Sequence, residues 1–328
     1  MKKNLLLVLV LTLTVFVIFS GIGCADDAGG KISVVYLGSL SASPHPYLAK
    51  AVTTIEDLLK NADFVDKYTF LNAEEDMLKA SILMDEAITL DPDVLVINAF
   101  DAKGFVESIK RAHQAGIKVV TCVHGIVDKT GWDYIVADVT PDSFEQGYNA
   151  GELAIEGAKN LFNNDLSGRT AIILMGYPFQ TGAVLRTQGF YAAISDADVG
   201  IEILESKTAH WSKDEAITVM ETMYAKYGQI DIVFGNNDSM ALGAVIAAEK
   251  EGVLADSIIV GVDGTPEALQ SIKDGLLYGV VYQNPLSVAE GVFEVVQKIA
   301  AGEDVPFINV SPAPKINANN VSEFVGIW

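Results

Sequence analysis

The stretch from residue 232 to residue 263, IVFGNNDSMALGAVIAAEKEGVLADSIIVGVD, decides the fold class of this chain. It begins with an apolar run at 232–234, continues as an amphipathic segment at 239–251 and ends in a second apolar run at 258–262. Strands that are apolar along their whole length are typical of parallel sheets covered on both faces. The stretch therefore predicts a unit in which a helix connects two parallel strands.

The same alternation extends through most of the chain. In the first half we expect strands at 32–37, 68–71, 94–97 and 117–123, and helices at 47–61, 74–90 and 105–115. In the second half we expect helices at 144–161, 183–194, 214–227, 239–251, 266–274 and 286–301, and strands at 171–175, 201–204, 232–234, 258–262 and 278–282. Repeated units of this kind predict an α/β fold of parallel sheets with helices on both faces.

The composition excludes several classes of protein. A chain of 328 residues is long enough for two domains of ordinary size, and with half of its residues hydrophobic it can form buried cores. The formal net charge of −21 repels nucleic acid, which is therefore not expected as a partner. The only two cysteines, Cys24 and Cys122, exclude a disulfide scaffold. Four scattered histidines give little basis for a metal site, and we expect no metal and no cofactor.

The N-terminus has the pattern of an export signal. Lys2 and Lys3 precede an apolar run at 5–19, which as a helix would span roughly 22 Å, too short for a hydrocarbon core of about 30 Å. The small residues directly before Cys24 resemble the lipobox of bacterial lipoproteins, although Gly21 stands where Leu is usual. We therefore expect a signal peptide at 1–23, lipidation of Cys24 and a lipid-anchored tether at 24–31. The alternative is an ordinary signal peptide or a membrane anchor, with Cys24 incidental.

Polar and aromatic side chains follow many of the predicted strands. In open parallel sheets, ligands bind beyond the carboxyl ends of the strands. The candidates there are Tyr47, Asn98, His124, Arg186, Trp211, Asn237, Asp263 and Gln283. Amide, carboxylate and guanidinium groups bind hydroxyls, and aromatic rings cover the C–H face of a sugar ring. The set therefore predicts a neutral, polyhydroxylated ligand.

Three motifs make the chain recognisable: TAHW at 208–211, NNDSMALGA at 236–244 and VGVDGTPEA at 260–268. Together they closely resemble the bacterial periplasmic sugar-binding proteins of the ribose/galactose-binding type, over essentially the whole mature chain. The resemblance implies the type I periplasmic binding protein fold. In it, two doubly wound parallel-sheet lobes are joined by three hinge crossovers and close on a ligand. The implied lobes are an N-terminal one at 32–137 plus 284–313 and a C-terminal one at 138–283 plus 314–328.

The resemblance also implies roles for the candidate residues. Asn98 would bind from the first lobe, and Arg186, Asn237 and Asp263 from the second. Trp211 would stack on the sugar, with Tyr47 as the facing ring and Gln283 at a crossover. His124 stands in a segment where ribose binders carry Asp-Arg, and Gln180 and Gly182 stand where galactose binders carry His and Asp. The segment 162–168 lacks the ligand spacing of the galactose-type calcium loop, so the sugar stays open and no metal is expected.

Five of the candidates have a structural alternative. Asn98 is also suited to capping the next helix, and Asp263 to shaping the turn that follows it. Trp211 fits a core position, Arg186 a surface ion pair and His124 a solvated loop. Beside Asn237, we expect Asp238 to serve the helix dipole and not the ligand.

The most consistent function is a lipid-anchored, extracytoplasmic solute-binding protein, a monomer that captures a monosaccharide and delivers it to the permease of an ABC importer. The sequence contains none of the motifs H-E-x-x-H, G-x-S-x-G or a Walker loop, so an enzyme is not expected. One alternative is a receptor for a sugar or an autoinducer-like ligand that feeds a chemoreceptor or sensor kinase. An exported enzyme or a sugar-responsive repressor fits less well, because the N-terminus is an export signal and not a DNA-binding headpiece.

Overall fold

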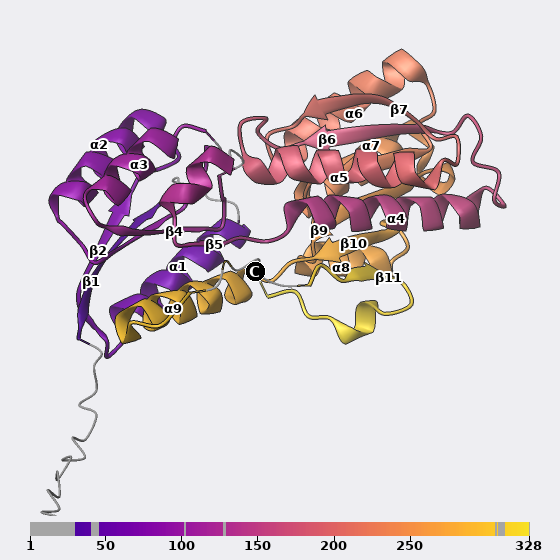
Figure 1. Ribbon diagram of the computed structural model, residues 1–328. Helices are drawn as coiled ribbons and strands as arrows, with labels where there is room; N and C mark the ends of the chain where they lie inside the picture. Colours follow the sequence, from indigo (N-terminus) through magenta and orange to yellow (C-terminus); the bar gives the residue numbers. More distant parts are fainter. Residues whose placement is uncertain are drawn as a thin grey trace, which may run out of the picture.

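The computed structural model describes residues 30–40, 46–101, 103–126, 129–305, 307 and 312–327 (Figure 1). The expected signal peptide, Cys24 and residues 24–29 of the tether lie outside these ranges. Within them the chain forms two lobes, each built on its own sheet with helices on both faces. The predicted fold class is confirmed.

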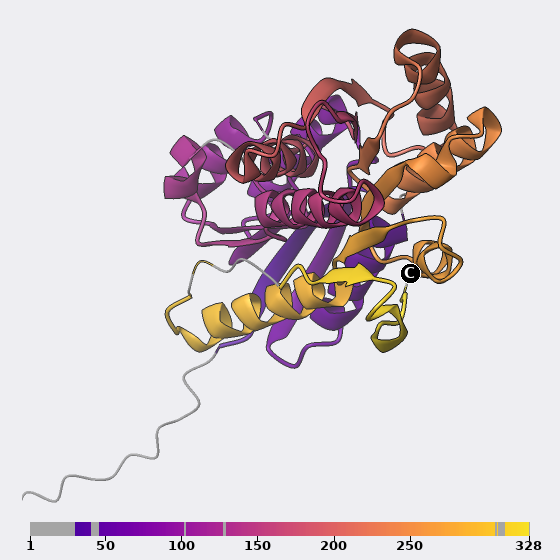
Figure 2. The ribbon, with the colours of Figure 1, turned by 90° about the vertical axis from the view of Figure 1, so that its right-hand side faces the viewer.

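The first lobe has a five-stranded parallel sheet in the order β2-β1-β3-β4-β5. Its strands are β1 (Ile32–Gly38), β2 (Val65–Asn72), β3 (Val94–Ile97), β4 (Lys118–Cys122) and β5 (Ala137–Val139). One face packs against α1 (Pro46–Lys60) and α9 (Pro285–Ala301), and the other against α2 (Met77–Thr89) and α3 (Val106–Gln114). A short 3-10 helix (Lys129–Tyr134) precedes β5. Although α9 is distant in sequence, it lies beside the strands of this lobe (Figure 2).

The second lobe has a six-stranded sheet in the order β11-β10-β9-β8-β6-β7, parallel except for β11. Its strands are β6 (Thr170–Met175), β7 (Glu202–Thr208), β8 (Ile232–Gly235), β9 (Ile258–Asp263), β10 (Gly279–Tyr282) and β11 (Lys315–Asn317). Helices α4 (Ser143–Leu161) and α5 (Thr181–Ala197) cover one face. The other face packs against α6 (Lys213–Tyr227), α7 (Asp238–Glu251) and α8 (Pro266–Lys273), and 3-10 turns occur at Leu254–Asp256 and Val321–Glu323.

The chain crosses between the sheets three times: from β5 to α4, from β10 to α9, and from α9 to β11. The third crossing runs partly through residues outside the described ranges. The lobe boundary expected after residue 137 lies inside β5, whose last residue, Val139, pairs with Cys122 of the first sheet. Thr181 also links the lobes away from the crossings, because its hydroxyl donates to the carbonyl of Gly125 at 2.5 Å.

Four strands differ clearly from expectation, and one of them is β2, which begins at Val65 and not at 68. The sequence did not predict β5 and β11, because three residues are too few to show a period. Strand β7 continues to Thr208 and not to 204, through Glu205, Ser206 and Lys207. It lies at the edge of the second sheet, where charged side chains are common in strands.

The backbones of α4 and α5 approach each other closely, and this contact fixes the position of Arg186. A Cβ atom at Gly147 would lie 1.9 Å from the Arg186 carbonyl oxygen, and one at Gly189 would lie 2.1 Å from that of Phe144. Only glycine permits such an approach. In the part of the chain that the structure describes, no helix is long and apolar enough to span a membrane.

Candidate functional site

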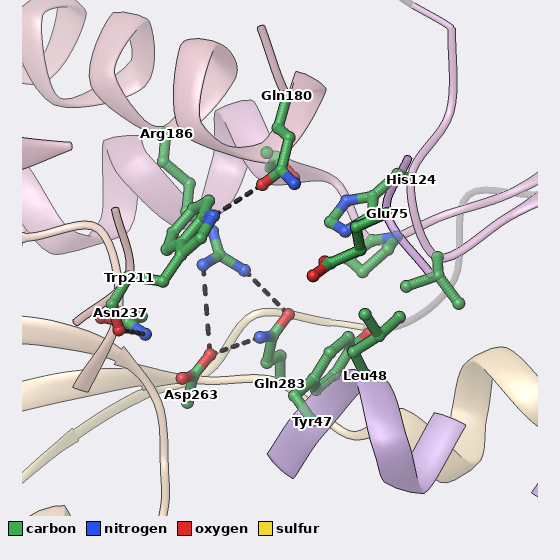
Figure 3. Close-up of a pocket in the computed structure, with 14 residues that line it drawn as sticks. Tyr47, Leu48, Glu75, His124, Gln180, Arg186, Trp211, Asn237, Asp263 and Gln283 are labelled. Carbon is green, nitrogen blue, oxygen red and sulfur yellow. Dashed lines mark hydrogen bonds and ion pairs between the residues drawn. The ribbon is translucent and has the colours of Figure 1, made fainter. Parts of the chain in front are cut away.

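A cleft with about 550 Å³ of space, counting its open mouth, lies between the lobes (Figure 3). Seven of the eight predicted site residues line it: Tyr47, His124, Arg186, Trp211, Asn237, Asp263 and Gln283. They come from α1, the end of β4, α5, the β7–α6 turn and the ends of β8, β9 and β10. The cleft therefore lies where the strand-end rule predicts a ligand.

Arg186 forms the centre of the second-lobe wall. It is only 6% exposed, which excludes the alternative of a surface ion pair. Its Nε donates to Gln146 Oε1 at 2.8 Å, one terminal nitrogen donates to the Asn236 carbonyl at 2.7 Å, and the other to Gln283 Oε1 at 2.9 Å. Three charge-assisted bonds to fixed partners hold the guanidinium in one orientation.

Asp263 lies next to this guanidinium and is fully buried. Its Oδ1 is 4.0 Å from Arg186 and accepts a hydrogen bond from Gln283 Nε2. Burial lowers the pKa of Arg186, and the Asp263 carboxylate opposes that shift. As the last residue of β9, Asp263 has φ 142°, a conformation that non-glycine residues rarely adopt. Such strain is common where a fold aims a side chain into a site.

Trp211 presents its indole to the cleft from the turn between β7 and α6. Its Nε1 donates to Gln180 Oε1 at 2.6 Å, and its ring centroid lies 5.8 Å from the Arg186 guanidinium. His210 and Trp211 both have positive φ, 49° and 62°. A Cβ at Gly176 would lie 2.0 Å from the indole, so only glycine leaves room for the ring. The ring is partly buried against the core, and it also lines the cleft.

The structural roles of Asn237 and Asp238 differ from those expected from the sequence. Asn237 is the N-cap of α7, since its Oδ1 accepts from the Met240 N–H at 2.9 Å, and it also lines the cleft. Asp238 lies in the first turn of α7, as expected, but its Oδ2 also accepts the N–H groups of Gly264 and Thr265, both at 2.8 Å. Asp238, and not Asp263, therefore holds the turn after β9. Burial, followed by the nearby Asp263, raises the pKa of Asp238 well above its usual value.

The first-lobe wall consists of Tyr47 and Leu48 from α1, Val123 and His124 after β4, and Glu75 after β2. Val123 has φ 62°, which is unusual for a β-branched residue. His124 is half-buried and faces the cleft, which argues against a purely solvated loop residue. Burial raises the pKa of Tyr47 above its usual value.

Asn98 is the predicted residue that the structure does not bring into this lining. It is fully buried, and within the described ranges its side-chain amide has no hydrogen-bond partner. The capping alternative is wrong, because α3 begins only at Val106 with Phe105 at its N-cap.

Seven lining residues were not among the candidates, and two of them, Glu75 and Gln180, have long polar side chains. Glu75 follows β2, so the strand-end rule that found the others also applies to it. Gln180 was noted in the sequence only as a departure from galactose binders, whereas here it holds the Trp211 indole. Among the residues with described positions, no group of three or more His, Cys, Asp or Glu could hold a metal ion.

Comparison with known proteins decides the family. Residues 38–304 match the family described as periplasmic binding protein domain. The chain belongs to this family. The family places the protein outside the cytoplasm and is one of solute-binding proteins, so the sequence resemblance is confirmed.

Several known proteins are similar to this chain over most of their own length. The chain is 27% identical to the ribose import binding protein RbsB of Bacillus subtilis (strain 168) over 282 residues, which cover 85% of this chain and 86% of the relative. It is 26% identical to the putative rhizopine-binding protein of Rhizobium meliloti over 274 residues, 83% and 86% of the two chains. An ABC transporter solute-binding protein from Bacillus halodurans C-125, solved with bound myo-inositol, has a TM-score of 0.76 at 26% identity and covers 90% and 97%.

Proposed function

We propose that this periplasmic binding protein captures a neutral monosaccharide or a closely related polyol between its lobes and delivers it to the permease of an ABC importer. The observation that carries the proposal is the buried Arg186–Asp263–Gln283 network beside the Trp211 indole. A relative named for ribose import and a solved neighbour with bound myo-inositol support it.

The chemistry of the second-lobe wall fits hydroxyl groups. A carboxylate accepts hydrogen bonds from hydroxyls, while a guanidinium and an amide donate to them. Because each sugar hydroxyl both donates and accepts, an adjacent pair of hydroxyls satisfies Asp263 and Arg186 at once. The Trp211 ring then covers the C–H face of the sugar. We propose the seven lining residues of the predicted set, Tyr47, His124, Arg186, Trp211, Asn237, Asp263 and Gln283, as ligand contacts.

The remaining proposals concern the form in which the protein acts. We propose a monomer without catalytic activity. The proposed lobes are 32–137 plus 284–313 and 138–283 plus 314–328, with the first boundary moved to Val139, where β5 ends. We also propose that it is anchored through lipid on Cys24. Two acyl signals or more give stable anchoring. Mass spectrometry of protein from its host should find a lipid-modified N-terminus at residue 24, and an unmodified N-terminus beyond it would refute the anchor.

A thermal-shift screen of the mature protein tests the ligand class. Pentoses, hexoses, inositols and acyclic polyols are the probes, with amino acids and nucleosides as the contrast set. A ligand present at about 100 times its Kd stabilises the native state by about 2.7 kcal/mol, which a melting curve resolves. Isothermal titration of the best probe then gives the Kd. Shifts confined to amino acids or nucleosides would overturn the proposal.

A further inference from the structure

The turn between β2 and α2 is built to hold one acidic side chain, Glu75, in the cleft. Glu74 and Glu75 both have positive φ, 54° and 59°, a left-handed conformation that is strained for residues other than glycine. Immediately after them, Asp76 caps α2 by accepting from the N–H groups of Leu78 and Lys79. Two successive left-handed residues without a glycine form an unusual turn, and it lies at the edge of the ligand cleft.

Hydrogen bonds from the loop after β1 fasten this turn. The buried Ser39 hydroxyl accepts the Glu75 N–H at 2.5 Å. Asn72 Oδ1 accepts the N–H groups of Leu40 at 2.9 Å and of Glu74 at 3.0 Å, and its Nδ2 donates to the Leu40 carbonyl at 3.1 Å. The backbone that carries Glu75 is thus tied to the first strand of the lobe.

The Glu75 carboxylate points into the cleft beside His124, and Arg186 and Asp263 lie on the opposite wall (Figure 3). The formally charged residues of the lining are Glu75, Asp263 and Arg186, with His124 as a titratable group. Arg186 already has Asp263 beside it as counter-charge. A ligand that reaches from the second-lobe wall to the first-lobe wall therefore meets the Glu75 carboxylate, a group that can only accept hydrogen bonds.

We propose that Glu75 is a specificity-determining residue, whose carboxylate accepts hydrogen bonds from ligand hydroxyls and disfavours ligands that carry a carboxylate or phosphate at that end. The inference rests on the proposed function and deepens it, since it restricts the ligand to neutral, donor-rich molecules. An anionic group that approaches this wall meets the like charge of the exposed Glu75 side chain at the edge of the cleft, and juxtaposed like charges disfavour wrong ligands.

The experiment compares Glu75→Gln with Glu74→Gln. Glu74 is a matched control, because it lies in the same turn and has positive φ, but its carboxylate pairs with Lys79 at 2.8 Å and does not line the cleft. Titrations are run at pH 8, where histidine side chains are ordinarily neutral. The neutral probes are D-ribose, D-glucose, xylitol and myo-inositol, and the anionic probes are D-glucuronate and D-ribose 5-phosphate.

For the tightest neutral probe, Glu75→Gln should weaken binding about tenfold or more, since bonds to a charged acceptor are lost. Glu74→Gln should stay within about twofold of the wild type, as is usual for surface changes. The wild type should bind the neutral probe much more tightly than either anionic probe. The Glu75→Gln variant should show a smaller ratio between these affinities. Glu75→Asp keeps the charge but shortens the side chain, so it should weaken binding and still reject the anions.

Equal affinities of wild type and Glu75→Gln for the neutral probe, or wild-type binding of an anion as tight as that of the neutral probe, would overturn the inference. Melting temperatures of the free variants check folding, and Gln places no new demand on the turn. If the wild type binds none of the neutral probes, the proposed function fails and this inference fails with it. If the wild type binds one and the two Gln variants behave alike, only the role of Glu75 is lost.

Discussion

Replacement of Asp263 by Asn tests the centre of the site, because it keeps the shape of the side chain and removes its charge. In the wild type this fully buried carboxylate lies 4.0 Å from the Arg186 guanidinium, which is itself 6% exposed. Asn retains one oxygen that can accept from Gln283 Nε2. It cannot balance the buried charge of Arg186.

Two consequences have calculable sizes. Unit charges 4 Å apart attract with about 4 kcal/mol at an effective dielectric constant near 20. Removing the nearby Asp263 charge also relieves its repulsion of Asp238, which offsets part of the loss. We therefore expect the free protein to lose about 2–3 kcal/mol, or about 4–12 °C in melting temperature. The sugar loses a charged acceptor, which weakens binding by about 1.5–3 kcal/mol, or about 10- to 150-fold.

Urea unfolding of the free protein and isothermal titration with the best sugar probe measure the two effects separately. Asp256→Asn is the control, since this exposed residue of the same lobe undergoes the same change of charge. It should leave both quantities almost unchanged. If Asp263→Asn matched this control in stability, the Arg186 ion pair would contribute nothing. If Asp263→Asn bound the sugar with the same affinity as Asp256→Asn, Asp263 would not contact the ligand.

Three further predictions follow from the structure. Trp211→Ala should weaken sugar binding about tenfold or more in titrations, through lost ring area and lost stacking, and unchanged affinity would remove Trp211 from the site. Burial raises the pKa of Asp138 to about 6, so the folded protein holds this proton more tightly and stability should fall as pH rises from about 4 to about 6. Asp138→Asn should remove that component and stabilise the protein at pH 7.5 by up to about 3 kcal/mol in urea unfolding, whereas an unchanged pH profile contradicts it. Gly147→Ala should destabilise by about 3 kcal/mol or more, because its Cβ meets the Arg186 carbonyl; a melting temperature equal to that of the wild type refutes the close contact.

The sequence predicted most of the fold because its signals are local. A buried strand such as β9 is apolar from Ile258 to Val262, and the helices between the strands show a helical period. The failures occur where the local signal is weak. Strands β5 and β11 have three residues each, and the second half of β7 is polar because it lies at the edge of the sheet.

The strand-end rule brought most candidates to one cleft, because parallel strands end at the same edge of a sheet. It passed over Glu75, because a helix was expected over residues 74–90, whereas α2 begins only at Met77 and Glu75 lies in the turn before it. It also placed Asn98 among the ligands, although this residue lies within the buried end of the first sheet and outside the cleft lining. The rule gives the end of the sheet at which a side chain lies, but not its direction there.

The direction depends on contacts that adjacent letters of sequence do not encode. Asn237 and Asp238 are neighbours, yet one caps α7 beside the cleft and the other ties the Gly264–Thr265 turn. That turn directly follows Asp263. Asp238, which does not line the cleft, therefore stabilises the backbone that orients Asp263, a proposed ligand contact.

The orientation of Arg186 also depends on contacts between residues distant in sequence, in this case on the packing of two helices. Glycine inside a helix costs about 1 kcal/mol relative to alanine, so Gly147 and Gly189 look unfavourable when each helix is considered alone. Their cost is explained by the contact between α4 and α5, which a methyl group at either position would prevent. The close contact brings Gln146 of α4 within 2.8 Å of the guanidinium. The geometry of the proposed sugar site therefore depends on residues that carry no chemistry of their own, and a sequence search for chemical groups passes over them.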